Sequence, residues 1–345
     1  MSSPVPRVSF VVLAYDGGQL LDRVVRSILG QAHPDVELVI VDNASSDGSV
    51  DRLALPDDAV VLRNDTNRGY AAGMNQGIAA SSGPVVVPCN QDVVLHPEFA
   101  ARAVAALAGG ERIAAVAPLV VHVGPDGELP TGGVVAVESG AQHLAWDMRV
   151  HDDGRSTDPH TCLKPSGACP VYRRAVLDEL SSPEGSPFAV VFDTYGEDVD
   201  LALRLASHGW KVQYEPSVLA GHTISSSSTP SVGDKRGRLR TNIVAGRHLN
   251  VWRHLPLPAA LAAALLVLVG DLAFVATRLV RRDLQVLGDV GRAWARVLGQ
   301  APRLVAHRRA NPRARGLVLS TRLGRRADAG SVDLAHLSGT EGVPA

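Results

Sequence analysis

The sequence predicts an α/β protein with a mostly parallel central sheet flanked by helices, followed by a helical, partly apolar and basic extension. Short apolar runs alternate with segments of helical periodicity over roughly the first hundred residues, which is typical of βαβ units. The runs lack polar alternation, as expected for strands covered on both faces. After residue 251 the chain changes to long apolar and arginine-rich segments with helical spacing.

The alternation predicts four strands in the first ninety residues. The last of them is bounded by Pro84 and Pro88. Ligands of such sheets bind beyond the carboxyl ends of the strands, so polar residues that follow a strand are site candidates. The predicted strands are residues 8–14 (VSFVVLA), 38–41, 60–62, 85–87 and, later, 211–214; the predicted helices are residues 20–29, 71–80, 98–107 and 197–208.

Two segments between these elements read as loops. Residues 124–159 are rich in Gly, Asp and Pro, and we expect a long, partly irregular binding loop there. Residues 225–231 form a Ser/Thr/Pro tract and predict a mobile loop.

The region after residue 251 predicts membrane association. Residues 259–277 approach the roughly 20 apolar residues that span a bilayer. Asp271 interrupts them, at a cost of about 2.5–3.5 kcal/mol in lipid. A basic amphipathic helix follows, and residues 278–326 contain 13 arginines against two acids. We expect a peripheral or hairpin mode rather than a full span; the alternative is a helical cap on the rest of the protein.

Composition favours a cytoplasmic location. The net charge of −1 names no partner. Three cysteines, Cys89, Cys162 and Cys169, are too few for a disulfide framework. The first ten residues, MSSPVPRVSF, do not read as a secretory signal. With the basic extension, these features predict the cytoplasmic face of the cell membrane.

Two strand ends carry polar residues suited to a ligand. Asp42 and Asn43 follow the second strand, although such residues also suit a turn. Asn90, Gln91 and Asp92 follow the fourth strand. A carboxylate in this position suits Mg²⁺ or Mn²⁺, which share oxygen ligands with substrate phosphates; the alternative is a turn cap.

A third cluster of acids opens a predicted helix. Glu197, Asp198 and Asp200 are favoured there by the helix dipole. Three neighbouring carboxylates repel one another, so one of them is a candidate general base, and Arg204 is expected to partner Glu197 or Asp198. His222 follows another strand and, together with Asp92, is a candidate metal contact.

Taken in order, these stretches resemble the family-2 inverting glycosyltransferases of GT-A fold, and among them the bacterial rhamnosyltransferase-type branch. The resemblance covers roughly residues 7–225. The matching pieces are VSFVVLAYDGG, ELVIVDNASSDGS, NDTNRGYAAGMNQGIAAS, VVVPCNQDVVLHPEF, PSGACPVYRRAVLDEL and FDTYGEDVDLALRLASHGWKVQYEP, followed by GH.

The resemblance implies a nucleotide-sugar site at these strand ends. Asp42 would accept a hydrogen bond from the imide N–H of a uracil or thymine. The family's DXD-type motif falls on Asn90-Gln91-Asp92, where only the last acid is present. The residues implied to bind the nucleotide sugar are Ala14, Tyr15, Asp42, Asn43, Arg68, Asn75, Asn90 and Gln91.

The resemblance also implies the reacting groups. Asp198 would be the catalytic base, and Asp92 with His222 would hold a divalent metal, Mg²⁺ or Mn²⁺. Gly167, Ala168 and Glu197 would border the acceptor and the donor sugar.

The implied reaction is a metal-assisted single displacement that inverts the anomeric centre. One base suffices for it, whereas retention needs a second, nucleophilic carboxylate. The donor would be a dTDP- or UDP-sugar, and rhamnose is the sugar we expect to be transferred. The basic, apolar C-terminal region suits a glycan, glycolipid or polyprenyl-linked hydroxyl as the acceptor, and no nucleic acid is expected. From composition and the extent of the resemblance, we expect a catalytic domain over residues 1–245, a membrane-associated helical region over 246–326 and a disordered tail over 327–345.

Other readings of the α/β pattern remain open. The chain has neither GxxxxGK[ST] nor GxGxxG after its first strand, which disfavours a kinase, ATPase or NAD enzyme. A nucleotidyltransferase would need a basic, glycine-rich segment there, and residues 14–18 (AYDGG) have no Lys or Arg. A non-catalytic scaffold that binds nucleotide sugars or lipids is the other alternative.

Overall fold

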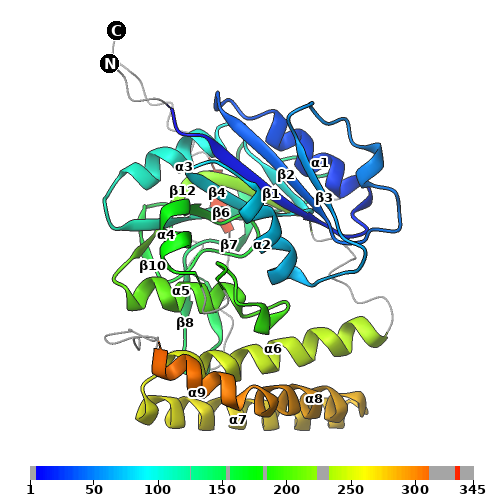
Figure 1. Ribbon diagram of the computed structural model, residues 1–345, viewed down its shortest axis with the longest axis vertical. Helices are drawn as coiled ribbons and strands as arrows, with labels where there is room; N and C mark the ends of the chain where they lie inside the picture. The colour runs from blue at the N-terminus through cyan, green and yellow to red at the C-terminus, as the bar shows by residue number, and fades with distance from the viewer. Residues whose placement is uncertain are drawn as a thin grey trace.

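The computed structural model describes residues 5–124, 126–152, 156–181, 185–223, 233–310 and 331–334. An 11-stranded mixed sheet forms the centre, with the strand order β10-β12-β6-β11-β4-β1-β2-β3 along its main path. Helices cover both faces, and α6, α7, α8 and α9 form a further layer at one end of the molecule (Figure 1). The predicted fold class is confirmed.

The predicted parallel strands form one half of the sheet. β1 (Val8–Ala14) lies between β2 (Val36–Asp42) and β4 (Val85–Asn90), and β3 (Val60–Arg63) pairs with β2. β4 continues through Pro88, beyond its predicted end. On the side of β4 that faces β11 (Val171–Arg173), the two strands pair only at Val85 and Val86. Pro88 therefore costs no hydrogen bond between β4 and β11.

The other half of the sheet was largely missed by the sequence pattern. β6 (Ile113–Val123) contains three alanines, which weaken a strand signal. β11 (Val171–Arg173) is antiparallel to both neighbours, and β12 (Lys211–Thr223) is much longer than predicted. Two short strands, β5 (Val93–Leu95) and β10 (His160–Cys162), pair with β12.

The expectation of an irregular loop at residues 124–159 is wrong for its centre. β7 (Val134–Ser139) pairs with β6, and β8 (Gln142–Leu144) forms a hairpin with β9 (Val150–Asp152). β13 (Ser331–Asp333) pairs with β7, so this part of the expected disordered tail is ordered. Residues 225–231, expected to be a mobile loop, lie outside the described residues.

Two hydrophobic cores hold helices on the faces of the sheet. α1 (Gly18–Leu29) and α3 (Phe99–Ala108) cover one face. α2 (Tyr70–Ala80), α4 (Arg174–Glu179) and α5 (Glu197–Ser207) cover the other. In α1 the buried residues recur at helical spacing, which is why the sequence predicted this helix: Leu21, Val24, Val25 and Ile28.

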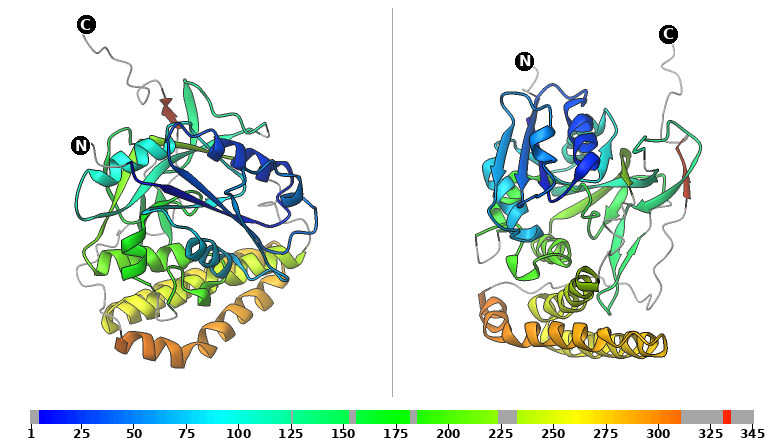
Figure 2. Two further views of the ribbon diagram at one scale, coloured as in Figure 1. Left: turned by 45° about the horizontal axis from the view of Figure 1, so that its top comes forward. Right: turned by 90° about the vertical axis from the view of Figure 1, so that its right-hand side faces the viewer.

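The α5 helix is buried on two sides. Leu201 and Leu205 pack toward the sheet, whereas Val199 and Leu203 pack on the helices that follow. These are α6 (Gly233–His254) and α7 (Leu257–Val280), so α5 lies between the sheet and the helical layer (Figures 1 and 2). The α6 helix runs through residue 245, where the sequence suggested a domain boundary.

The α7 helix is the one helix among the described residues that is long and apolar enough to cross a membrane. It lies along α6 and α8 (Gln285–Gly299) rather than apart from the molecule, and α9 (Ala301–Ala310) contacts α6 and α8 (Figure 2). Asp271 is 1% exposed and accepts hydrogen bonds from Arg247 and His248 of α6. The acid that counted against a membrane helix therefore joins α7 to α6.

Candidate active site

The carboxyl ends of β1, β2 and β4 meet at one edge of the sheet. Ala14 is in register with Asp42, and Leu13 with Asn90. The Gln91 side chain extends this contact, because its amide accepts from the backbone N–H of Tyr15 at 2.8 Å and donates to the Tyr15 carbonyl at 3.1 Å. Five of the predicted nucleotide-site residues therefore lie together.

The loop after β2 is joined to the loop after β1. Asp16 Oδ1 accepts from the backbone N–H of Ser46 at 2.7 Å, and Asp47 Oδ2 accepts from that of Gly18 at 2.9 Å. Asp42 itself accepts from the N–H of Ser45 at 2.9 Å and from Arg63 at 3.2 Å. Hydrogen bonds of the DNASSDGS stretch thus hold the two loops together at this edge of the sheet.

Asn43 and Asn75 make structural contacts. Asn43 is buried and accepts from the backbone N–H of Arg68 at 2.9 Å, which shapes the loop before α2 and leaves the Arg68 side chain exposed. Both polar atoms of the Asn75 side chain bond the backbone of Phe188, at 2.7 and 2.9 Å. Contacts of these residues with a nucleotide stay a prediction.

Asp92, in the turn between β4 and β5, lies beside His222 of β12. His222 Nε2 is 2.9 Å from Asp92 Oδ1, and His222 Nδ1 is 2.6 Å from Glu138 Oε2 on β7. Burial lowers the pKa of His222, but the hydrogen bonds and charges of Asp92 and Glu138 outweigh it and raise this pKa to about 10. Without a metal, the two carboxylates therefore favour a protonated imidazole, and a divalent cation bound at Nε2 would displace the proton that faces Asp92.

This donor set fits a divalent cation that is shared with a substrate. One imidazole nitrogen and one carboxylate suit Mn²⁺ or Mg²⁺ when phosphate and water oxygens supply the remaining ligands. Glu138 would then hold the second ring nitrogen, as carboxylates do behind metal-bound histidines. In the part of the chain that the structure describes, no group of three or more His, Cys, Asp or Glu side chains forms a complete metal cage.

Asp198 forms an ion pair with a buried lysine. Lys164 Nζ is 2.8 Å from Asp198 Oδ2, and the lysine side chain is 2% exposed whereas that of Asp198 is 24% exposed. Gly167 borders the same carboxylate, since a Cβ at residue 167 would lie 3.6 Å from Asp198 Oδ2. The Ala168 carbonyl accepts from the backbone N–H of Asn90, which links the segment to β4.

Glu197 differs from Asp198 in its surroundings. It is buried, and its Oε2 has no hydrogen-bond partner among the described residues. Burial, together with the charge of Asp198, raises the pKa of Glu197 to about 8. Glu197 is therefore protonated at neutral pH, and Asp198 is the accessible carboxylate of the pair.

The segment before α5 is strained. Asp193 and Tyr195 have φ angles of 63° and 72°, which are unusual for residues other than glycine. The pKa of Tyr195 is raised by burial and by the charges of Glu197, Asp92 and Asp198. Asp92 and Asp198 therefore both contribute to the raised pKa of Tyr195.

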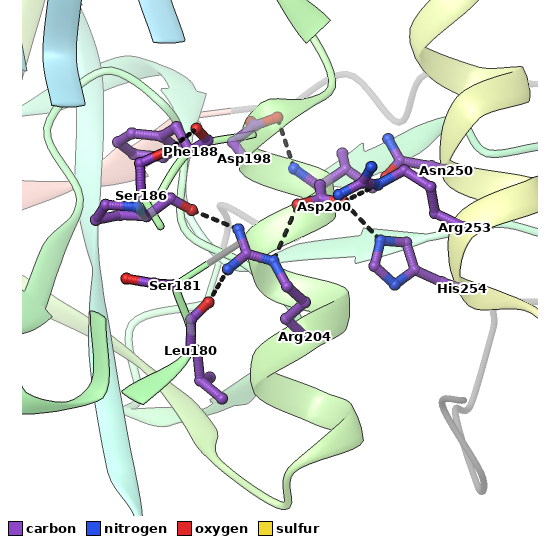
Figure 3. Close-up of polar contacts among 12 residues, drawn as sticks. Leu180, Ser181, Ser186, Phe188, Asp198, Asp200, Arg204, Asn250, Arg253 and His254 are labelled. Atoms are coloured by element: carbon purple, nitrogen blue, oxygen red, sulfur yellow. Dashed lines mark hydrogen bonds and ion pairs between the residues drawn. The ribbon is translucent and has the colours of Figure 1, made fainter. Parts of the chain in front are cut away.

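Asp200, the third acid of the cluster, is a structural hub (Figure 3). It is fully buried and accepts from Arg204 at 3.0 Å, from Arg253 at 2.7 Å and from His254 at 2.8 Å. The expectation that Arg204 partners Glu197 or Asp198 is wrong. Four residues along a helix separate neighbours on one face, so Arg204 meets Asp200 instead.

Two residues of the site were missed by sequence reasoning. Lys164 and Glu138 both lie in regions where the sequence showed no motif, and each meets its partner only across the folded sheet. The one available signal was that Lys164 is among few lysines in an arginine-rich chain.

Comparisons with known proteins find curated relatives of modest identity. A protein named "Succinoglycan biosynthesis protein ExoO" from Rhizobium meliloti is 35% identical over 96 residues, which cover 27% of this chain and 28% of that protein. An "N-acetylglucosaminyl-diphospho-decaprenol L-rhamnosyltransferase" from Mycobacterium tuberculosis is 25% identical over 269 residues, covering 70% of this chain and 85% of that protein. The chain spans only 27%, 28% and 30% of the length of the first three curated relatives it matches.

A solved structure shares the fold. The crystal structure of GalNAc-T7 with UDP, GalNAc and Mn²⁺ superposes with a TM-score of 0.52 and 17% identity, over 64% of this chain and 43% of that one. This confirms the expected GT-A type of architecture. Residues 9–181, half of the 345-residue chain, match the family described as Glycosyl transferase family 2. The chain therefore belongs to glycosyl transferase family 2.

Proposed function

We propose that this protein is an inverting glycosyltransferase that moves a sugar from a nucleotide diphosphate to an acceptor hydroxyl. The observation that carries the proposal is the difference between neighbouring acids: the Asp198 carboxylate is partly accessible and paired with Lys164, whereas Glu197 is buried and its Oε2 has no hydrogen-bond partner among the described residues. A single accessible base is what an inverting displacement needs.

Asp198 takes the proton of the acceptor hydroxyl as its oxygen attacks the anomeric carbon. The bond between that carbon and the diphosphate oxygen breaks, and the nucleoside diphosphate leaves with the bonding electrons. Lys164 balances the charge of Asp198 and fixes its orientation through the 2.8 Å ion pair. Gly167 leaves room beside the carboxylate for the acceptor.

The donor site in this proposal is the edge formed by Ala14, Tyr15, Asp42, Asn90 and Gln91. The exposed guanidinium of Arg68 is free to approach a diphosphate. Asp92 and His222 would hold the divalent metal, which stabilises the negative charge of a leaving diphosphate when it is bound. The crystal structure of GalNAc-T7 contains UDP and Mn²⁺, which supports this choice of ligands.

The finer specificity is a proposal in the same sense. We favour a dTDP- or UDP-sugar, with rhamnose as the transferred sugar, and a polyprenyl-linked or other glycan acceptor. The name of the Mycobacterium tuberculosis relative supports the choice of rhamnose as the sugar and of a polyprenyl-linked acceptor. Assembly of a cell-wall or other polysaccharide would use such a reaction.

We also propose that the helical layer contacts the cytoplasmic face of a membrane, lying on it rather than spanning it. The inner face of α7 packs through Ala260, Ala263, Val267 and Asp271. Its outer face exposes an apolar stripe at spacings of three and four residues: Leu257, Leu261, Leu265, Val269 and Leu272. A helix held on one side and apolar on the other suits in-plane contact with lipid. Residues 246–326 would then be the membrane-associated region, and residues 1–245 the transferase.

The test is the substitution Asp198→Asn, measured against a panel of nucleotide sugars by release of nucleoside diphosphate. We expect a loss of transfer of at least about a hundredfold, the usual size of a general-base contribution, with donor binding unchanged. The exposed Asp178→Asn, on α4, is the matched control and should transfer normally. Transfer by Asp198→Asn at the wild-type rate would refute the assignment of the base.

A further inference from the structure

A cavity of about 870 Å³ opens on the side of Asp198 that faces the helical layer. Its floor is the start of α5, with Tyr195, Gly196 and Asp198. Its walls are α6, the C-terminal part of α7 and the β8–β9 hairpin. None of the donor-edge residues at the ends of β1, β2 and β4 lines it, so the cavity and the proposed donor site meet only around the base.

The cavity is strongly basic. Five arginines line it, Arg149, Arg236, Arg240, Arg247 and Arg278, and the one acid among its lining residues is Asp198. Three of these arginines are joined to carboxylates outside the lining: Arg149 to Asp147, Arg240 to Asp283 and Asp289, and Arg247 to Asp271. These three build the wall and have limited charge to offer a ligand.

Arg236 and Arg278 are different. Within the described residues neither has an ion pair with a carboxylate, and Arg278 instead lies over the ring of Phe274, 5.4 Å from its centroid. Both charges act on Asp283, which is already hydrogen-bonded to Arg240 at 2.6 Å. Guanidinium groups that face an open cavity without a carboxylate partner suit a phosphate, which accepts two parallel N–H bonds from each of them.

The remaining wall is apolar. Leu239, Ile243 and Val244 of α6 face the cavity together with Phe274 of α7. The same α7 helix exposes its apolar stripe on the outer face of the layer. A ligand that fits this cavity therefore combines an anionic group with an apolar chain.

We propose that this cavity binds the diphosphate and the first isoprenoid units of a lipid-linked acceptor, with Arg236 and Arg278 as the diphosphate ligands. The inference rests on the proposed function, because a base must face the molecule that it deprotonates, and Asp198 lines this cavity. The diphosphate then anchors the acceptor so that its sugar hydroxyl lies at Asp198. The chain leaves between α6 and α7 toward the membrane side of the layer.

The experiment uses the full-length protein and farnesyl diphosphate, a soluble isoprenoid diphosphate, below the concentration at which it forms micelles. Calorimetric titrations are made with saturating UDP and Mn²⁺, so that the donor edge cannot hold the probe. Farnesol tests the need for phosphate, and inorganic pyrophosphate tests the need for the chain. The variant Arg236→Gln/Arg278→Gln is compared with Arg281→Gln/Arg309→Gln, which removes the same charge from exposed positions that do not line the cavity.

We expect the wild type and the control variant to bind farnesyl diphosphate within twofold of each other. The wild type should bind farnesol and inorganic pyrophosphate at least tenfold more weakly than farnesyl diphosphate. The Arg236→Gln/Arg278→Gln variant should bind farnesyl diphosphate at least tenfold more weakly than the wild type does. The single variant Arg236→Gln, at an exposed position, should show an intermediate loss, which covers the case in which the double variant folds poorly.

Equal binding by the Arg236/Arg278 variant and the wild type would overturn the proposal. So would farnesol binding as well as the diphosphate, or competition between the probe and UDP. Binding of nucleotide sugars, measured on the same proteins, separates this inference from the proposed function. A wild type that binds no nucleotide sugar yet binds farnesyl diphosphate through the two arginines would refute the transferase and keep the cavity.

Discussion

Asp200 offers a direct test of how the helical layer holds the active site. The substitution Asp200→Asn keeps the shape of the side chain and removes its charge. The side chain is fully buried between α5 and α6, and it is the carboxylate partner of Arg204 and Arg253. In the variant, two guanidinium groups remain in the interior without that carboxylate.

The expected loss of stability follows from this geometry. Removing one partner of a buried ion pair costs about 3–5 kcal/mol, because the other charge stays buried. Since the free energy of unfolding of a domain is about 5–15 kcal/mol, the variant should be visibly destabilised. His254 adds little to the charge imbalance, because burial is the main cause of its lowered pKa and leaves it neutral.

The loss should depend on pH in a definite direction. Burial raises the pKa of Asp200, but Arg204 and its other partners outweigh burial and hold this pKa well below the ordinary value of 3.8. The stability that the carboxylate provides is therefore fully present above about pH 4 and is lost as the pH falls through its folded-state pKa. The difference between wild type and variant should shrink in acid.

The assay is urea unfolding followed by circular dichroism, with Asp178→Asn as the control at an exposed position. A second variant, Asp200→Asn/Arg253→Gln, removes one of the two stranded charges and should recover part of the lost stability, as coupled neighbours do. A loss below about 1 kcal/mol in Asp200→Asn, in the range of surface substitutions, would show that the hub does not hold α5 to α6.

Three further predictions concern the metal, the acid pair and the membrane. Asp92→Ala should weaken Mn²⁺-dependent binding of a nucleotide sugar at least tenfold, and unchanged, metal-independent affinity in calorimetry would remove Asp92 from the metal site. Because the folded-state pKa of Glu197, about 8, lies above its ordinary 4.5, wild-type stability should fall as the pH rises from 4.5 to 8. Glu197→Gln should remove that slope and gain stability at pH 8 but not at pH 5 in denaturant titrations; an unchanged slope would mean that Glu197 is ionised. Leu261→Ser/Leu265→Ser should reduce sedimentation with anionic liposomes about tenfold or more, since full burial of a leucine is worth about 1.5–3 kcal/mol, and equal sedimentation would argue against contact through α7.

Local patterns in the sequence were enough to predict the nucleotide-binding half of the fold. The apolar run of β1 and the spacing of Leu21, Val24 and Ile28 in α1 specify their elements directly, because burial has a period that the chain can show. Asp42 and Asp92 could be placed at a common edge since the carboxyl ends of parallel strands coincide. Antiparallel β11 and alanine-rich β6 gave no such signal.

By itself, the sequence determined the family, the parallel strands, and the candidate acids at strand ends and at the start of α5. Only the tertiary structure decided which charges meet. Lys164 pairs with Asp198 across 34 residues, and Asp271, a liability when read along α7, bonds Arg247 of α6. The physical reason is the distance along the chain over which each property is set. Hydrophobic periodicity depends on neighbouring residues, whereas the raised pKa of Glu197 and the exposure of the Arg236 and Arg278 guanidinium groups to the cavity depend on elements that are distant in the sequence.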